Sequence, residues 1–311
     1  MRALARLVVV LGPTASGKSA LGIRLAQKFG GEIVVCDSTQ VYRHFDIGTA
    51  KVPFTERQGI PHHLVDLVEP QEIFTAGDYR RHARTVLGKI RSRGKLPILT
   101  AGTGLYLRAL LEGLADAPIR SEELRERLRR KAELHGSAHL HRILSRLDPT
   151  AAARIAPRDA QKVIRAIEMR VLTGKPVGEI HGGGRIALEG FEVKKIGLIP
   201  PRAALYARIE SRIDAMLAAG WLDEVRQLVA HGIAPDAKPF QFIGYAELRA
   251  HLSGEFGSEE AKRKIQQATR RFAKRQITWF RKEPGVHWVP EFGDEPSALA
   301  LASEFLQSET R

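Results

Sequence analysis

A glycine-rich segment near the start of the chain carries residue types that bind phosphate. Residues 12–19 read Gly-Pro-Thr-Ala-Ser-Gly-Lys-Ser and match the G-x-x-x-x-G-K-S pattern of a P-loop. In such a loop, backbone N–H groups converge on phosphate oxygens, and the helix that follows adds partial positive charge. Lys18 would neutralise a terminal phosphate, and Ser19 would offer its hydroxyl to phosphate or Mg²⁺. The predicted phosphate site consists of Gly12, Pro13, Thr14, Ala15, Ser16, Gly17, Lys18 and Ser19.

A carboxylate follows the next apolar segment of the chain. Residues 32–36 predict a buried strand, and Asp37 comes directly after it. Because ligands of open α/β sheets bind at the carboxyl ends of the strands, Asp37 should lie near the P-loop. It could hold Mg²⁺ or accept a proton as a general base, and the alternative is an Asp that caps a turn. The strand predicted at 96–100 ends without a carboxylate, which separates this P-loop from that of an ordinary ATPase.

Two further groups could contact a ligand. Gly102-Thr103-Gly104 can bring backbone and a hydroxyl close to a ligand, with a tight strand–helix turn as an equal alternative. Arg208 and Arg212 are four residues apart and could clamp phosphate, although this spacing is more typical of a solvated helix face.

The histidines and the cysteine favour structural roles. His62, His63 and Asp66 could suggest zinc, but adjacent residues of a strand project in opposite directions and no third ligand follows at metal spacing. Cys36 is interpreted as a buried apolar residue rather than a nucleophile.

Strand and helix patterns alternate through the first part of the chain, and this alternation predicts a doubly wound parallel α/β sheet. The pattern stops at 121–173, which is basic and contains no strand candidate, and a strand at 192–199 resumes the sheet. We therefore predict a P-loop core from 1–115 and 189–311 and an all-helical insertion at 116–188. Predicted strands are 7–11, 32–36, 62–66, 96–100 and 192–199; predicted helices are 20–29, 76–93, 203–219, 222–231, 245–252 and 259–282.

The charge of the chain indicates a polyanionic partner. Its 311 residues carry a net charge of +14, which favours nucleic acid over a membrane surface. A single cysteine excludes an internal disulfide, and no apolar run approaches the roughly 18 residues of a membrane span. We expect a cytoplasmic protein without a signal peptide. The last long helix should pack against the protein through Ile265, Ala268, Phe272 and Phe280. Its basic residues should face the RNA: Lys262, Arg263, Arg270, Arg271, Lys274, Arg275, Arg281 and Lys282.

Eight short motifs, taken together, resemble one family. They are GPTASGKS at 12–19, DSTQVY at 37–42, DIGTAK at 46–51, PHHLVD at 61–66, AGTGLY at 101–106, LDPTAAARI at 147–155, IGY at 243–245 and AKRQITWFR at 273–281. In this order they resemble the bacterial tRNA dimethylallyltransferases over nearly the whole chain. Thr39 and Thr100-Ala101 depart from the commoner family residues, at positions that the chemistry does not require.

The resemblance implies an activity and residue roles. The family transfers the dimethylallyl group of dimethylallyl diphosphate to N6 of the adenosine beside the anticodon, at tRNA position 37, forming N6-dimethylallyladenosine (i6A). It implies Asp37 as the general base and Thr103 as a contact of the flipped adenine. Lys18, Ser19 and Arg212 would meet the diphosphate together with Mg²⁺, for which Ser19 is the expected ligand.

The family's tRNA contacts map onto three stretches of this chain. The implied partner is the anticodon stem-loop, bound by a protein expected to be a monomer. The implied tRNA-binding residues are Asp37, Ser38, Thr39, Gln40, Thr103, Gln161, Lys162, Val163, Ile164, Arg165, Gln241, Phe242, Ile243, Gly244, Tyr245 and Ala246.

Two other classes of protein fit a P-loop in a basic chain. A small-molecule kinase should show an apparatus for γ-phosphate transfer and need no basic insertion. A non-catalytic RNA-binding nucleotide switch should bind ATP or GTP selectively over an isoprenoid diphosphate. Whether ATP competes for the P-loop stays open at this point.

Overall fold

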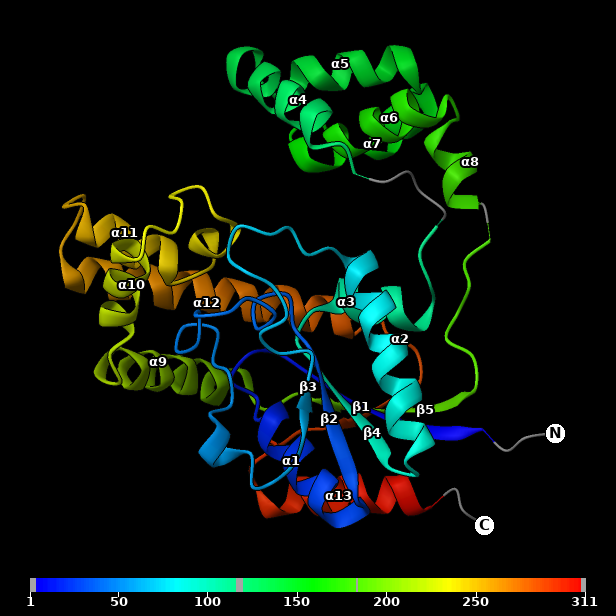
Figure 1. Ribbon diagram of the computed structural model, residues 1–311, viewed down its shortest axis with the longest axis vertical. Helices are drawn as coiled ribbons and strands as arrows, with labels where there is room; N and C mark the ends of the chain where they lie inside the picture. The colour runs from blue at the N-terminus through cyan, green and yellow to red at the C-terminus, as the bar shows by residue number, and fades with distance from the viewer. Residues whose placement is uncertain (1–3, 116–119, 183, 309–311) are drawn as a thin grey trace. The chain divides into compact units, whose positions relative to one another are not determined.

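Figure 1 shows the computed structural model of the chain, which describes residues 4–115, 120–182 and 184–308. The chain divides into two compact units. One, the core unit, is formed by the chain up to Leu111 and from Leu188 onward; the other, the helical unit, is Glu112–Ala187. The predicted insertion was 116–188, and its first residues, 116–119, lie outside the described residues, as does Gly183.

The core unit is built on a parallel sheet. Its strands are arranged in the order β3-β2-β4-β1-β5-β6, and each neighbouring pair is parallel. The predicted doubly wound α/β fold is therefore confirmed. The described strands are β1 Ala5–Leu11, β2 Gly31–Cys36, β3 His62–His63, β4 Leu96–Ala101, β5 Phe191–Leu198 and β6 Val286–Val289.

Helices cover both faces of this sheet and so bury its central strands on both sides. In β1, Leu7, Val9 and Leu11 pack with α2 (Ala76–Ser92) and α3 (Gly104–Leu111). Val8 and Val10 point the other way and pack with α1 (Lys18–Phe29) and α13 (Pro296–Gln307). A continuous apolar run such as 7–11 is what a strand buried on both faces requires.

Two elements near the C-terminus differ from the prediction, which made the chain after β5 entirely helical up to 282 and assigned nothing beyond. β6 adds a strand beside β5, and α13 adds a further helix. β6 is a four-residue edge strand in which only Val289 is buried, so it lacks the apolar run of the central strands. β3 is also shorter than the predicted 62–66, because the chain leaves the sheet after His63.

The remaining helices of the core unit surround a third apolar cluster. Trp221, Tyr245, Phe240 and Phe45 form its centre. Gly244 has a left-handed φ of +92°, and a β-carbon there would overlap the Trp221 ring. The helices are α9 Arg202–Ala218, α10 Trp221–Ala230, η2 Lys238–Gln241, α11 Tyr245–Leu252 and α12 Ser258–Phe280, and a short η1 Phe54–Glu56 lies earlier in the chain.

The helical unit has its own apolar core. Leu140, Leu144, Val163 and Ile167 are buried at its centre. Asp148 ties two of its helices together, because its carboxylate accepts hydrogen bonds from Ala151 N at 2.9 Å and Val177 N at 2.7 Å. Its helices are α4 Glu122–His135, α5 Ser137–Leu147, α6 Pro149–Arg154, α7 Ala160–Thr173 and α8 Val177–Gly182 (Figure 1).

A buried ion-pair cluster stabilises the helical unit. The carboxylate of Glu168 is fully buried and accepts hydrogen bonds from Arg125, Arg165 and Ser121 N. Burial alone would raise the pKa of Glu168, but these hydrogen bonds outweigh it and lower the pKa from 4.5 to about 2. Because the folded pKa lies below the unfolded one, this stabilisation is complete above pH 4.5 and is lost as the pH falls toward 2.

We expect Glu168→Ala to lower the free energy of unfolding of the helical unit by about 3–5 kcal/mol at neutral pH, because it leaves two arginines without their buried partner. The difference from wild type should shrink as the pH falls from 7 toward 3. Denaturant unfolding at several pH values, followed by circular dichroism, measures both effects. Glu126→Ala is the matched control, since Glu126 pairs with Arg129 and Arg130 at the surface. Equal effects of the two substitutions would contradict the prediction.

The described residues contain no helix that combines the length and the apolar character needed to cross a bilayer.

Candidate active site

The P-loop lies between β1 and α1 and depends on two glycines. At Gly12 an added β-carbon would lie 2.8 Å from Leu198 O, and at Gly17 it would lie 2.6 Å from Gly293 N. Gly17 also has a φ of +86°, and α1 begins at the next residue, Lys18. The Ser16 hydroxyl is buried and has no hydrogen-bond partner among the described residues. The loop thus combines a helix N-terminus with a buried hydroxyl that has no partner in the described part of the chain.

Two cations and one carboxylate converge beside this loop. The Lys18 ammonium donates to Pro13 O at 2.7 Å, and Arg212 of α9 reaches Thr14 Oγ1 at 3.5 Å. Burial lowers the pKa of Lys18 to about 8, the negative charge of Asp37 opposes that shift, and the charge of Arg212 adds to it. The pKa of Arg212 is also lowered, chiefly by burial. Three residues that are distant in the sequence therefore share one electrostatic environment.

The two arginines of α9, Arg208 and Arg212, contact different parts of the protein. Arg208 forms a bidentate ion pair with Asp294, at 2.7 and 2.9 Å. One helical turn later, Arg212 is half-buried against the P-loop. The two arginines therefore have different protein partners, Asp294 for Arg208 and the P-loop for Arg212, and the phosphate clamp stays a prediction.

Asp37 lies at the carboxyl end of β2 with its two carboxylate oxygens in different surroundings. Oδ1 accepts hydrogen bonds from Thr39 N at 2.9 Å and from Thr39 Oγ1 at 2.7 Å. Oδ2 has no hydrogen-bond partner among the described residues and lies beside Gly102, where a β-carbon would be 2.6 Å away. The turn-capping alternative is thus correct for one oxygen, while the other is available to a ligand.

Thr103 joins the end of β4 to the end of β2. Its hydroxyl accepts from Ser38 N at 3.0 Å and lies 3.2 Å from Ser38 Oγ. The backbone N–H groups of Gly102 and Thr103 both donate to Cys36 O, at 3.0 and 3.1 Å. These bonds place Thr103 next to the segment that carries Asp37. Burial raises the pKa of the Cys36 thiol, in agreement with its predicted role as a buried apolar residue.

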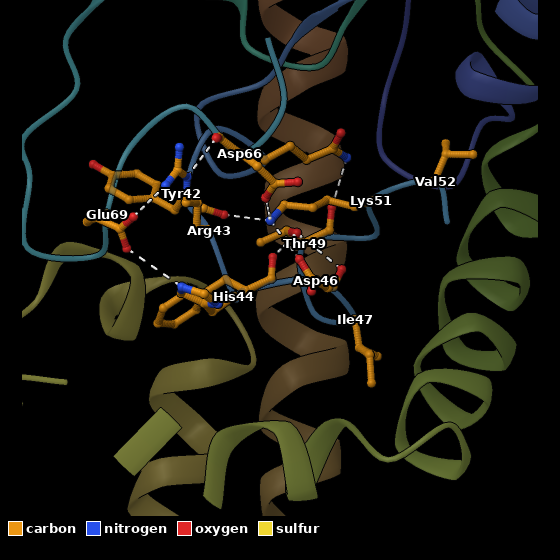
Figure 2. A network of polar contacts seen from close by, with 12 residues as sticks. Tyr42, Arg43, His44, Asp46, Ile47, Thr49, Lys51, Val52, Asp66 and Glu69 are labelled. Carbon is orange, nitrogen blue, oxygen red and sulfur yellow. Dashed lines mark hydrogen bonds and ion pairs between the residues drawn. The ribbon is translucent and has the colours of Figure 1, made fainter. Parts of the chain in front are cut away.

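A polar network fixes the loop that follows Asp37 (Figure 2). The ammonium of Lys51 is almost fully buried and bonds to Asp46 at 2.7 Å, Asp66 at 2.5 Å and Tyr42 O at 2.6 Å. Gln40 donates to the carbonyls of residues 49 and 50, at 3.0 and 3.2 Å. Lys51 therefore links two motifs, because Asp46 lies in its own motif at 46–51 and Asp66 in the motif at 61–66.

The predicted structural roles of the histidines also have identifiable partners. His63 pairs with Glu32 at 2.7 Å, and His62 Nδ1 lies 2.8 Å from Ile60 O. Asp66 belongs to the Lys51 network described above. Across the described ranges, no group of three or more His, Cys, Asp or Glu side chains could hold a metal ion.

The structure adds a residue that the sequence analysis did not single out. Gln276 of α12 is buried, accepts from Thr14 N at 2.7 Å and donates to Gly102 O at 2.8 Å. Its signal in the sequence was its position on the packing side of α12, in register with Ile265 and Phe280. That side was predicted incorrectly in part: Ala268 and Phe272 are half-buried, whereas the buried residues of the helix are Ala261, Ile265, Ala273, Gln276 and Phe280.

The RNA-facing charges predicted for the last long helix are mostly exposed, although α12 ends at Phe280, before Arg281 and Lys282. Lys262 pairs with Asp214, and Arg270 pairs with Glu210, so these two are partly neutralised. The exposed ones are Arg263, Arg271, Lys274, Arg275, Arg281 and Lys282.

The stretch 241–246 of the core unit is only partly accessible. Gln241 and Ala246 are exposed, and Phe242 and Ile243 are half-buried. Gly244 and Tyr245 are buried, and the Tyr245 hydroxyl donates to Glu224 at 2.5 Å and accepts from Gly48 N at 3.1 Å. Tyr245 therefore fixes this stretch to the interior of the core unit through its hydroxyl.

The stretch 161–165 of the helical unit shows the same division. Gln161 and Lys162 are exposed, while Val163 and Ile164 are buried in the core of the unit. Arg165 is half-buried in the cluster around Glu168. The side chains accessible to a partner are thus those at the start of α7.

Residues 40–283 match the family model described as IPP transferase. The chain belongs to the IPP transferase family. Its relatives include a tRNA dimethylallyltransferase of Solibacter usitatus, 53% identical over 299 residues that cover 96% of this chain and 97% of that protein.

Solved structures of similar proteins cover nearly the whole chain. The full-length tRNA isopentenylpyrophosphate transferase of Bacillus halodurans is 38% identical, with a TM-score of 0.70 over 97% of this chain and 94% of that one. A eukaryotic dimethylallyltransferase described as acting on tRNA is 28% identical, with a TM-score of 0.81 over 98% of this chain and 80% of that one. The similarity therefore includes both units of this family member.

Proposed function

We propose that this IPP transferase transfers the dimethylallyl group of dimethylallyl diphosphate to N6 of the adenosine at tRNA position 37, forming i6A and releasing diphosphate. The observation that supports it best is the Oδ2 of Asp37, which has no hydrogen-bond partner among the described residues and shares the electrostatic environment of Lys18 and Arg212. A base for an amine and a cationic site for a diphosphate are the two parts that this reaction needs.

The P-loop side of the site binds the diphosphate and stabilises it as it leaves. When the bond between the allylic carbon and its bridging oxygen breaks, the oxygen keeps the electron pair. The negative charge that develops there is met by Lys18, Arg212 and the N–H groups at the start of α1. The Ser16 hydroxyl, buried without a partner among the described residues, would donate to a phosphate oxygen.

Asp37 acts on the other substrate. As N6 of adenosine forms its bond to the allylic carbon, the nitrogen loses a proton, and Oδ2 of Asp37 accepts it. Thr39 holds the other oxygen, which fixes the direction of the carboxylate. General-base catalysis of this kind typically contributes about 10²–10⁴-fold to the rate.

The residues at the site fit Mg²⁺. The ion is usually held by one or two carboxylates together with substrate phosphates and water. Ser19 supplies a hydroxyl, so it would hold the ion together with phosphate oxygens and water, while Oδ2 of Asp37 keeps its role as the base. Bound there, the ion would neutralise charge on the departing diphosphate.

Thr103 and the loop after Asp37 would receive the adenine. The adenine must leave the base stack of the anticodon loop. This unstacking costs a few kcal/mol, and the cost is smallest in an unpaired loop. The hydrogen bonds of Thr103 to Ser38 hold this wall of the site in place. The exposed residues Gln161, Lys162, Gln241 and Ala246 would contact the surrounding RNA. The protein would act in the cytoplasm and as a monomer.

One assay tests the function as a whole. Purified protein is incubated with labelled dimethylallyl diphosphate, bulk tRNA and Mg²⁺. The label in RNA is counted, identified by nucleoside analysis and located in the sequence by mapping of ribonuclease fragments. Label in i6A at position 37 is the expected result. Labelled ATP in place of the diphosphate is the control, and transfer of a phosphate from ATP to a small molecule without i6A formation would support a kinase instead.

Lys18 gives diphosphate binding a pH dependence. Because burial lowers its pKa to about 8, the ammonium loses its charge above that pH in the free protein. We expect the Kd for dimethylallyl diphosphate to rise by up to about tenfold per pH unit above 8. Lys18→Met should weaken binding by about 10–100-fold at neutral pH and abolish that dependence. Arg212→Ala should likewise weaken the diphosphate more than tRNA.

Separate titrations of the two substrates, by fluorescence and by filter binding, measure these effects. Lys28→Met is the matched control, because Lys28 is an exposed lysine of the same helix. Loss of tRNA affinity in place of diphosphate affinity would show that Lys18 or Arg212 serves the RNA.

A further inference from the structure

A buried amide side chain connects two loops of the core unit. Gln276 of α12 has 6% of its surface exposed, and its amide bonds to Thr14 N at 2.7 Å and to Gly102 O at 2.8 Å. Thr14 and Gly102 are 262 and 174 residues away in the sequence. A polar group left unpaired in the interior destabilises the folded protein, so both bonds matter for a glutamine at this position.

The polarity of the two partners fixes the orientation of the amide. A backbone N–H can only donate and a backbone carbonyl can only accept, so the Gln276 oxygen must face Thr14 and its nitrogen must face Gly102. A flipped amide would place donor against donor and acceptor against acceptor. Of the standard side chains, only a carboxylic acid in its protonated form reproduces this pair of bonds with a similar length.

Each of the two loops carries part of a different substrate site. Thr14 belongs to the P-loop, and its hydroxyl faces Arg212. Gly102 packs against the free oxygen of Asp37, since a β-carbon there would lie 2.6 Å from Oδ2. Gln276 thus joins the diphosphate side of the site to the wall beside the carboxylate.

We propose that Gln276 is a positioning residue for dimethylallyl transfer, which holds the P-loop and the Gly102 turn at the separation that brings the allylic carbon to the attacking amine. This inference rests on the proposed function. Its amide oxygen and its amide nitrogen are bonded to Thr14 and Gly102, so Gln276 would act through these two residues. Reacting atoms must approach to about 3–3.5 Å, and a misplacement of about 1 Å can cost about 10²-fold in rate.

Two substitutions test this role in the full-length protein. Gln276→Met keeps the length of the side chain and removes both hydrogen bonds. We expect its single-turnover rate constant, at saturating concentrations of both substrates, to fall by about 100-fold. The Kd values for dimethylallyl diphosphate and for tRNA, titrated separately, should stay within about threefold. A loss in the rate constant without a matching loss in binding is the signature of positioning.

The matched control is Ile265→Ala in the same helix. Ile265 is fully buried in the third apolar cluster, and its side chain has no polar group, so its truncation destabilises α12 without removing either hydrogen bond of Gln276. Its folded fraction should transfer the group at the wild-type rate. If Gln276→Met is no slower than this control, or within about threefold of wild type, the proposal is wrong.

Gln276→Glu adds a second measurement, the pH dependence of the rate, which a purely structural role of Gln276 would not change. This variant tests the positioning role even if Gln276→Met does not fold. A buried carboxyl has a raised pKa, and its protonated form can donate to Gly102 O and accept from Thr14 N. The ratio of variant to wild-type rate should therefore rise as the pH is lowered from 8 to 6. A ratio that stays flat across this range would overturn the proposal. Failure of the wild-type protein to form i6A would instead overturn the proposed function, so the two failures are distinct.

Discussion

Asp37→Asn is expected to lower the single-turnover rate of dimethylallyl transfer by about 10²–10⁴-fold, the contribution typical of a general base. Asparagine keeps an oxygen that can accept the two hydrogen bonds from Thr39, so the local turn should persist. The amide cannot take the proton that N6 loses. Binding of tRNA and of dimethylallyl diphosphate should change much less than the rate, because the substituted group acts on a proton that moves in the transition state.

Rapid-quench measurement on saturating tRNA gives the rate constant, and thermal melting confirms that the variant is folded. Asp223→Asn provides a matched loss of a carboxylate, since Asp223 is exposed and pairs with Arg226 within α10. A rate for Asp37→Asn within a few fold of wild type would exclude Asp37 as the base. The activity would then have to use another acceptor close to the P-loop.

The parts of the site that were predicted correctly are those encoded by neighbouring residues. The P-loop needs its glycines, lysine and serine within eight positions, and the apolar strands on either side of it are continuous runs. Asp37 could be placed because it directly follows such a strand, and parallel strands end at one edge of the sheet. Local signals of this kind require no knowledge of what the rest of the chain does.

The parts that could not be predicted depend on partners distant in the sequence. Arg208 and Arg212 look alike in the sequence, and the difference between them is made by Asp294, 86 residues after Arg208. In the sequence, Gln276 is a polar residue on the apolar side of a helix. Only the structure shows that its amide bonds to Thr14 and Gly102. Such pairings are decided by tertiary structure, which spacing within one helix does not report.

The missed strand has a different cause. β6 gains its place from pairing with β5 rather than from its own composition, because three of its four residues are only half-buried. The Lys51 network is an intermediate case: its motifs were recognised, but the contact of Lys51 with Asp66 was not. Motif recognition thus located the residues, and the structure supplied the reason for them.

The helical unit leads to the second large prediction: its removal should abolish tight tRNA binding and leave the core unit folded. The two ends of the core unit meet where the helical unit leaves it, since Leu188 N donates to Leu111 O at 3.0 Å. A short Gly/Ser linker in place of 112–187 can therefore close the chain without strain. The core unit keeps its sheet and three apolar clusters, and it should bind dimethylallyl diphosphate with the wild-type Kd.

The expected loss is in RNA affinity and in its dependence on salt. Each phosphate contact adds roughly 0.7–0.9 to the slope of log affinity against log salt, so losing several contacts flattens that slope as well as weakening binding. Titration of tRNA at several salt concentrations measures both quantities, and circular dichroism with thermal melting reports whether the variant is folded. A milder variant, Lys162→Ala, should lower the slope by about one contact, because Lys162 is exposed at the start of α7.

The competing explanation is that the helical unit braces the core unit. Its own apolar core and the buried Glu168 cluster argue against a need for mutual support, because each unit buries its apolar residues internally. An unfolded deletion variant would nevertheless show that the brace is real. A folded variant with undiminished tRNA affinity and an unchanged salt slope would show that the helical unit does not grip the RNA, and the exposed arginines and lysines of α12 would then have to carry that binding alone.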